Sequence, residues 1–156
     1  MKEAKSLTYV SEFHETFGHP VQQKPIIPSS ERCQLRVSLL DEELKELQNA
    51  INDKNIVEIA DALCDIQYVL AGAILEFGLG EKFGELFEEV QRSNMSKACN
   101  SMKDAEATVK HYKETENIDC IVKEINNKFL VYRSRDNKVM KSIYYSPAEL
   151  KPIIFS

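Results

Sequence analysis

The chain has 156 residues, of which 43% are hydrophobic and 29% are charged, and its formal net charge at pH 7 is −5. This composition is typical of a folded domain, and the acidic balance argues against a protein that binds nucleic-acid polymers through their phosphates. The first residues hold no apolar run of signal-peptide length, and acids interrupt the longest apolar stretch, so neither a leader nor a membrane span is expected. Four scattered cysteines without zinc-site spacing fit a reducing, cytoplasmic location.

Apolar residues recur at helical spacing over the first two thirds of the chain. The spacing predicts helices over residues 6–17, 30–51, 56–77, 81–98 and 103–114, with a proline-rich loop at 19–30. Gly18 is expected to end the first helix, Ser29 or Ser30 to cap the second, and Asn55 to cap the third. Because only four residues separate the second and third helices, these two should be antiparallel neighbours.

From residue 118 the pattern changes to short runs that are rich in β-branched and aromatic residues. These runs predict strands over 118–125, 128–134 and 138–145, with turns between them. The expected fold class is therefore mainly α, an antiparallel helical bundle with a small C-terminal antiparallel β unit. We expect a helical domain over residues 1–115 and a β appendage over 116–156.

The predicted third helix carries an acidic stripe on an otherwise apolar surface. Glu58, Asp61 and Asp65 lie three and four residues apart, which places them within roughly 60° of one another around the helix. A helix that is apolar nearly all round is normally buried, so Cys64 is expected to be a core residue. Buried carboxylates are costly unless they are paired or bind a metal. Glu76 continues the stripe near the helix end and is expected to be exposed.

A second acidic stripe lies on the preceding helix, where Glu42, Glu43 and Glu46 can lean toward one edge. Packed helices lie about 8–10 Å apart, so carboxylates from both helices could meet around Mg²⁺, or Mn²⁺, rather than zinc. Some of these acids also have explanations that involve no metal. The second-helix acids could form an ordinary solvated face, and Glu58 could complete a capping box with Asn55. A capping box does not explain Asp61 or Asp65, which lie deeper in the helix.

Residues suited to phosphate gather near the end of the fourth helix. Arg92 and Lys97 are cationic and Asn94 can donate from its side chain, although a basic helix C-terminus has the same composition. His14 and His19 flank the proline-rich loop and could contact a phosphate or a base. Histidines without a metal or catalytic partner are more often structural or exposed.

Five short motifs connect the chain to a known family. Residues 42–46 form an EExxE stretch, residues 58–61 an ExxD stretch, residues 13–21 read FHETFGHPV, residues 61–72 DALCDIQYVLAG, and residues 89–97 EVQRSNMSK. On these motifs the chain resembles the all-α NTP pyrophosphohydrolase superfamily, which includes MazG-like proteins. Within it, the chain is similar to the bacterial branch that resembles phosphoribosyl-ATP pyrophosphohydrolase. The tail over residues 132–150 is similar to that branch as well.

The resemblance implies a Mg²⁺ site with four ligands, Glu43, Glu46, Glu58 and Asp61. It implies further that Glu42 assists, that Asn94 and Lys97 approach phosphates, and that the active form is a homodimer or a dimer of dimers. Asp65 could be a further ligand or a supporting residue.

We therefore predict a Mg²⁺-dependent hydrolase that cleaves a nucleoside triphosphate between its α and β phosphates. Glu42 or Glu46 would orient or deprotonate the attacking water, while Lys97 and Arg92 would neutralise the leaving pyrophosphate. Phosphoribosyl-ATP is an alternative substrate, and a non-catalytic helical metal-binding or interaction module is an alternative class. A di-iron bundle is disfavoured because no histidine follows a glutamate at Glu-x-x-His spacing.

Overall fold

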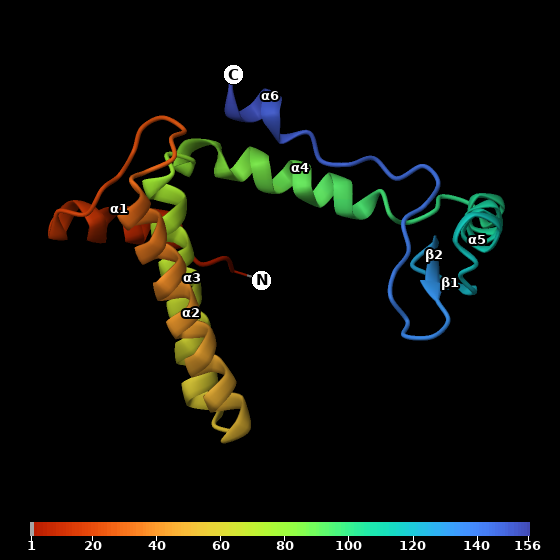
Figure 1. Ribbon diagram of the computed structural model, residues 1–156, viewed down its shortest axis with the longest axis horizontal. Helices are drawn as coiled ribbons and strands as arrows, with labels where there is room; N and C mark the ends of the chain where they lie inside the picture. The colour runs from red at the N-terminus through yellow and green to blue at the C-terminus, as the bar shows by residue number, and fades with distance from the viewer. Residues whose placement is uncertain (1) are drawn as a thin grey trace. The chain divides into compact units, whose positions relative to one another are not determined.

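The computed structural model describes residues 2–156, and the chain divides into two compact units, Met1–Phe83 and Gly84–Ser156. The structure is mainly helical, with one two-stranded antiparallel sheet in the second unit (Figure 1). This arrangement confirms the predicted fold class. The predicted division near residue 116 coincides with the change from helix to strand, and as a domain boundary it stays a prediction.

Unit 1 is built from α1 (Ser6–Phe17), α2 (Ser30–Asn52) and α3 (Ile56–Glu76), each within about one residue of its predicted bounds. Local chemistry explains where these helices begin and end. Gly18 ends α1 in the left-handed conformation with φ of 70°. The Ser29 hydroxyl accepts from the Arg32 amide at the start of α2, and the Asn55 side chain accepts from two amides at the start of α3.

Helices α2 and α3 form an antiparallel pair whose register can be followed through successive neighbours. Gly72 lies beside Arg36, Leu39 and Val69 line one pocket, and farther along the pair the Glu43 carboxyl interacts with that of Asp65. Near the C-terminal end of α3, helix α1 packs against it around a small core of Val10, Ala71 and Leu75, with Leu7 and Val21 beside them. The acidic segments of α2 and α3 therefore lie next to each other in the hairpin.

Gly78 holds the proline-rich loop against the end of α3. Its φ is +67°, and a Cβ there would lie 1.9 Å from the carbonyl oxygen of Lys24, so both the conformation and the space require glycine. The Ile26 amide also donates to the Phe77 carbonyl at 3.0 Å. These contacts attach the loop to the C-terminal end of α3.

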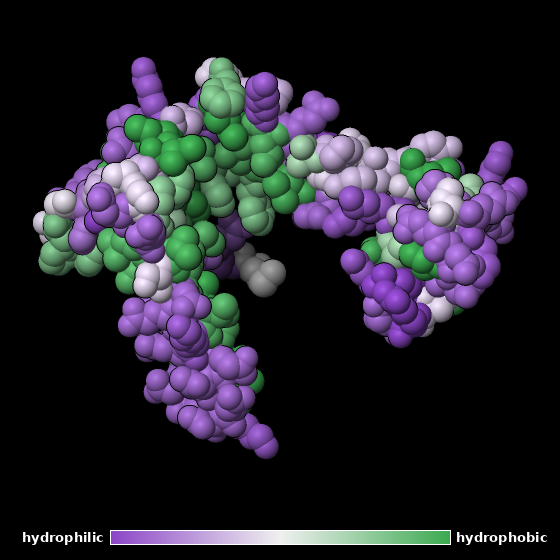
Figure 2. All heavy atoms as spheres, viewed as in Figure 1, coloured by the Kyte–Doolittle hydropathy of each residue, from purple (hydrophilic) through white to green (hydrophobic). Residues whose placement is uncertain are grey.

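The expectation that α3 is buried along its length is wrong. Most of its buried residues lie in the C-terminal part, where α1 packs. In the N-terminal part Ala62 is buried, but Leu63 is 51% and Val57 70% exposed. Cys64 is exposed as well, so the prediction that it belongs to the core is also wrong. Exposed apolar residues on α2 include Val37 and Leu44. Figure 2 shows apolar surface over unit 1, and the face of the α2–α3 hairpin end seen in this view is mostly hydrophilic.

The rest of the chain begins with a 3₁₀ turn at Gly80–Lys82 and contains α4 (Phe83–Met95), α5 (Met102–Glu116), β1 (Cys120–Ile125), β2 (Lys128–Arg133) and α6 (Leu150–Ile154). The strands pair in antiparallel register with Val122 opposite Val131, and the turn between them places Asn126 and Asn127 at positive φ. A core of Cys99, Ala105, Val131 and Met140 lies between α5 and this hairpin.

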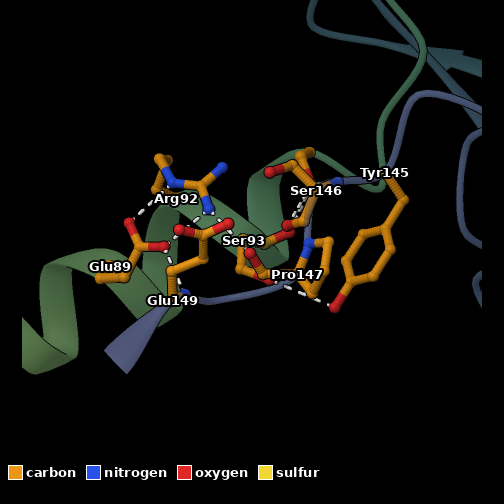
Figure 3. A network of polar contacts seen from close by, with 8 residues as sticks. Glu89, Arg92, Ser93, Tyr145, Ser146, Pro147 and Glu149 are labelled. Carbon is orange, nitrogen blue, oxygen red and sulfur yellow. Dashed lines mark hydrogen bonds and ion pairs between the residues drawn. The ribbon is translucent and has the colours of Figure 1, made fainter. Parts of the chain in front are cut away.

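The predicted third strand does not form. Residues 138–145 contribute a single bridge between Val139 and Tyr132, after which the chain runs along α4. The Ser146 amide donates to the Ser96 hydroxyl at 2.9 Å. The Glu149 amide donates to the Glu89 carboxylate at 2.9 Å, as Figure 3 shows. Helix α4 ends at Met95 rather than near residue 98, and α6 was not predicted. Within residues 2–156, no single helix is long and apolar enough to cross a membrane.

Candidate functional site

The centre of the acidic region is Glu43 on α2. Burial raises the pKa of its carboxyl, and the neighbouring carboxylates Glu46, Asp65, Glu42 and Asp61 raise that pKa further. The Oε2 atom of Glu43 is buried and has no hydrogen-bond partner among the described residues. Helices α2 and α3 therefore bring four of the predicted acids close enough to Glu43 to repel its carboxylate.

Glu58 precedes Asp61 by three residues, about one turn of α3. It is exposed in the first turn of α3, and it is not among the groups that act on the Glu43 carboxyl. The capping-box alternative is only half present. The Asn55 side chain accepts from the Glu58 amide, but the Asn55 amide donates to the Ala50 carbonyl at 3.1 Å. The role of Glu58 as a metal ligand stays a prediction.

The acidic cluster, defined as Glu42, Glu43, Glu46, Asp61 and Asp65, offers carboxylate oxygens to a cation. Among residues 2–156, no three potential ligands are already arranged around one metal position. The donor set nevertheless fits Mg²⁺ or Mn²⁺, because every side chain offers carboxylate oxygen and one buried oxygen lacks a partner. A cation would also relieve the mutual repulsion that raises the pKa of Glu43.

A second charged cluster lies at the other end of the paired helices. Glu76 is fully buried and forms ion pairs with Arg32 and Arg36 of α2. Burial alone would raise the pKa of Glu76, but the hydrogen bonds from both guanidinium groups outweigh it and leave the pKa below its ordinary value. The prediction that Glu76 is exposed is therefore wrong, because the antiparallel register places it opposite these two arginines.

His14 belongs to this second cluster. Its Nδ1 lies 2.9 Å from the Pro20 carbonyl oxygen, and its Nε2 lies 3.2 Å from Arg36 Nη2. Because a guanidinium can only donate, Nε2 accepts and the Nδ1 proton is donated to Pro20, which makes the ring neutral. Burial lowers the pKa of His14 accordingly. A Cβ at Gly72 would lie 2.7 Å from Arg36 Nη1, so the network needs glycine there.

The Arg32–Arg36–Glu76–His14 network was not found from the sequence. The available signal was a pair of arginines four residues apart on α2, which places both on one helix face. The sequence suggests His14 as a contact for phosphate or base, whereas in the structure both of its ring nitrogens have partners within unit 1.

The residues expected to contact phosphate lie in unit 2. Arg92 forms two hydrogen bonds of 2.7 Å with Glu89 and one of 3.0 Å with the Pro147 carbonyl (Figure 3). This pairing lowers the pKa of Glu89 to about 2. Lys97 donates to the Asn94 side chain at 2.7 Å. The Arg92 guanidinium is thus already hydrogen-bonded within the chain. The roles of Arg92, Asn94 and Lys97 toward phosphate stay predictions.

Lys97 also lines a pocket of about 340 Å³ in which three further basic residues take part, Arg133, Lys138 and Lys141. Sequence reasoning missed these three because they are distant from Lys97 along the chain. Another pocket of unit 2, of about 420 Å³ and lined by residues 117–119 and 133–135, contains none of the predicted site residues.

Comparison with known proteins decides the family. A family model described as phosphoribosyl-ATP pyrophosphohydrolase matches residues 10–94, a span that includes all acids of the acidic cluster. The chain belongs to the phosphoribosyl-ATP pyrophosphohydrolase family. This family is part of the MazG-like all-α NTP pyrophosphohydrolase superfamily, so the expected resemblance is confirmed. The protein is accordingly a pyrophosphohydrolase that acts on acid anhydrides, and its family implies a nucleotide substrate.

A viral relative is similar to this chain over nearly the whole length of both proteins. An uncharacterized protein of Acanthamoeba polyphaga mimivirus is 24% identical, and the match covers 92% of this chain and 93% of that protein. The family model includes Arg92 and Asn94 but ends before Lys97 and the β hairpin. The C-terminal part of the chain is therefore shared with the viral relative but lies outside the family model.

Proposed function

We propose that this pyrophosphohydrolase cleaves a nucleoside triphosphate between its α and β phosphates in a Mg²⁺-dependent reaction that releases a nucleoside monophosphate and pyrophosphate. The observation that carries the proposal is the acidic cluster, above all the buried and unpaired Oε2 of Glu43. An unsatisfied buried polar atom typically costs about 1–3 kcal/mol, and like charges beside it add to that cost. A cation that arrives with the substrate would remove both penalties.

Within the acidic cluster we assign different tasks to different carboxylates. Glu43, Glu46 and Asp61 would hold Mg²⁺, with Asp65 as a further ligand or a support and Glu58 as a more distant ligand. When bound, Mg²⁺ would supply positive charge against the triphosphate. Glu42 or Glu46 would orient the attacking water and accept its proton.

Asn94 and Lys97 are proposed to contact the phosphates, because an amide and an ammonium suit phosphate oxygens. Arg92 is proposed to add positive charge while it remains paired with Glu89. The cytoplasmic location stays a prediction.

A homodimer or a tetramer is part of this proposal. Its support is the exposed apolar surface of the hairpin, where Val37, Leu44, Val57 and Leu63 all face outward in a single chain. Exposed apolar patches of this kind usually mark an interaction surface. A second copy that covers α2 and α3 would also exclude water from the neighbouring acids.

Phosphoribosyl-ATP remains the second candidate substrate, because the matching family model bears that name. Both substrates carry a triphosphate, so the acidic cluster suits either one, and only a direct comparison of rates separates them. A non-catalytic interaction module would release no pyrophosphate from any nucleotide.

The test is a pyrophosphate-release assay with Mg²⁺ over the common NTPs, dNTPs and phosphoribosyl-ATP. Wild-type protein should release pyrophosphate from at least one nucleotide, and Glu46→Gln should lower kcat by roughly 10²–10⁴-fold, as expected for loss of a general base. Glu31→Gln, an exposed acid in the first turn of the same helix, is the matched control and should retain wild-type kcat. Release from no nucleotide, or full activity in Glu46→Gln, would contradict the proposal.

A further inference from the structure

A pocket of about 220 Å³ lies within unit 1 between α1, α2 and α3. Its accessible walls include Phe13, His19, Leu35 and Tyr68. The Phe13 ring is central: the His19 ring stacks on it with 5.8 Å between centroids and 16° between planes, and the Tyr68 ring meets it edge-on at 5.6 Å. Phe13 is 37% and Tyr68 38% exposed, so part of each aromatic surface remains open to a ligand.

The pocket adjoins the acidic cluster along both paired helices. Leu39 lines the pocket and Glu43 follows it by four residues, whereas Tyr68 lines the pocket and Asp65 precedes it by three. At 1.5 Å per residue these separations are about 5–6 Å along each helix. A nucleotide whose phosphates lie at the acidic cluster would therefore carry its base toward this pocket. The pocket is smaller than the roughly 300–1,000 Å³ of sites that enclose a whole ligand, so it suits one ring system.

The charges around the pocket favour a base over a phosphate. The guanidinium groups of Arg32 and Arg36 are engaged by Glu76, and the neutral ring of His14 fills the space between Arg36 and Pro20. The Arg36 side chain is only 9% exposed, and its Nε has no acceptor among the described residues. A carbonyl oxygen on a base would provide an acceptor for this Nε. The hydrocarbon side chains that line the pocket provide none.

We propose that this pocket binds the base of the nucleotide substrate, with its ring against Phe13 and Tyr68 and its polar edge toward His19 and Arg36. The inference rests on the proposed function and adds to it the subsite that selects the substrate. Stacking on aromatic side chains tolerates every base, so the pocket distinguishes nucleotides from base-free phosphates more strongly than one base from another.

The experiment compares a nucleotide with a ligand that has no base. Phe13→Leu and Tyr68→Leu remove an aromatic ring and keep apolar volume, and Tyr9→Leu, an exposed aromatic of α1 outside the pocket, is the matched control. KM for the preferred nucleotide should rise about 5- to 100-fold in the two pocket variants, as expected for loss of base stacking, while kcat changes little. Inhibition by inorganic triphosphate with Mg²⁺ should be unchanged, and Tyr9→Leu should match wild type throughout.

Failure of this inference and failure of the proposed function are distinguishable. An unchanged KM in both pocket variants, or an equal loss of affinity for inorganic triphosphate, would overturn the base pocket while catalysis stands. If the wild type hydrolyses no nucleotide, calorimetric binding of nucleoside monophosphates to wild type, Phe13→Leu and His19→Ala still tests the pocket. Equal affinities in the three proteins, or no binding to wild type, would refute it. Because His19 is exposed, His19→Ala should still fold, so a loss of binding in this variant would not be due to misfolding.

Discussion

Two regions of the α2–α3 pair differ in how their charged side chains are paired. Near the C-terminus of α3, the fully buried Glu76 carboxylate has two guanidinium partners, and its pKa is held below the ordinary value. About two turns along α2, at Glu43, the neighbouring charges are other carboxylates, and the pKa is raised. The same two helices thus carry one satisfied charge cluster and one unsatisfied cluster.

This difference separates a structural role from a functional one. The arginine network joins α2 to α3 and, through His14, to α1, so it stabilises unit 1 without any ligand. The acidic cluster lowers the stability of the ligand-free protein, since its charges repel one another in a partly buried place. Natural proteins retain such destabilising groups mainly where they serve binding or catalysis.

The largest effect on stability is expected from the satisfied cluster. Glu76→Gln should lower the free energy of unfolding by about 3–5 kcal/mol, because two arginines lose their buried partner. Chemical denaturation measures this change. Replacement of Arg36 and Glu76 together by methionine should recover part of the loss, since the only charge that then lacks its partner is Arg32, whose side chain is 31% exposed. A loss below about 0.5 kcal/mol in Glu76→Gln would show that the network contributes little.

Acid should weaken the same cluster in two steps. The pKa of His14 lies below its ordinary 6.5, so the unfolded chain takes up a proton first and stability begins to fall as the pH drops below 6.5. The pKa of Glu76 lies below its ordinary 4.5, so a further loss follows as the pH falls through the folded-state value. Denaturant unfolding from pH 7.5 to 3.5 measures both steps. In Glu76→Gln the lower step should be smaller, and a wild-type stability that is constant down to pH 4 would contradict this account.

The helices of unit 1 were predictable because local signals determine them. Apolar spacing, the caps at Ser29 and Asn55, and Gly18 marked the ends of the helices within about one residue. The third strand was not predictable, because the amides of residues 142–149 donate to other partners than β2. The Ser142 amide donates to the Lys97 carbonyl and the Ile143 amide to the Thr108 hydroxyl, and those of Ser146 and Glu149 donate to the side chains of Ser96 and Glu89. These hydrogen bonds depend on tertiary contacts, and strand propensity contains no information about such contacts.

For the candidate site, spacing identified which acids share a helix face but not what lies opposite them. Glu43 and Glu76 belong to the same two helices, and only the register between α2 and α3 places one among acids and the other between arginines. The aromatic pocket likewise needs α1 beside both helices, because Phe13 and Tyr68 come from different helices. Helix spacing gives the composition of each face, and the tertiary arrangement determines its partners.

The central claim is that the acidic cluster is a cation site, and thermal unfolding of wild type and Glu43→Gln with and without Mg²⁺ tests it most directly. Without metal, Glu43→Gln should melt slightly higher than wild type, because the repelled carboxylate is gone. Mg²⁺ at about 100 times its Kd should stabilise the wild type by ~2.7 kcal/mol, which raises its Tm by several degrees, and should shift Glu43→Gln much less. A wild-type Tm that Mg²⁺ leaves unchanged, or a full shift in Glu43→Gln, would contradict the claim.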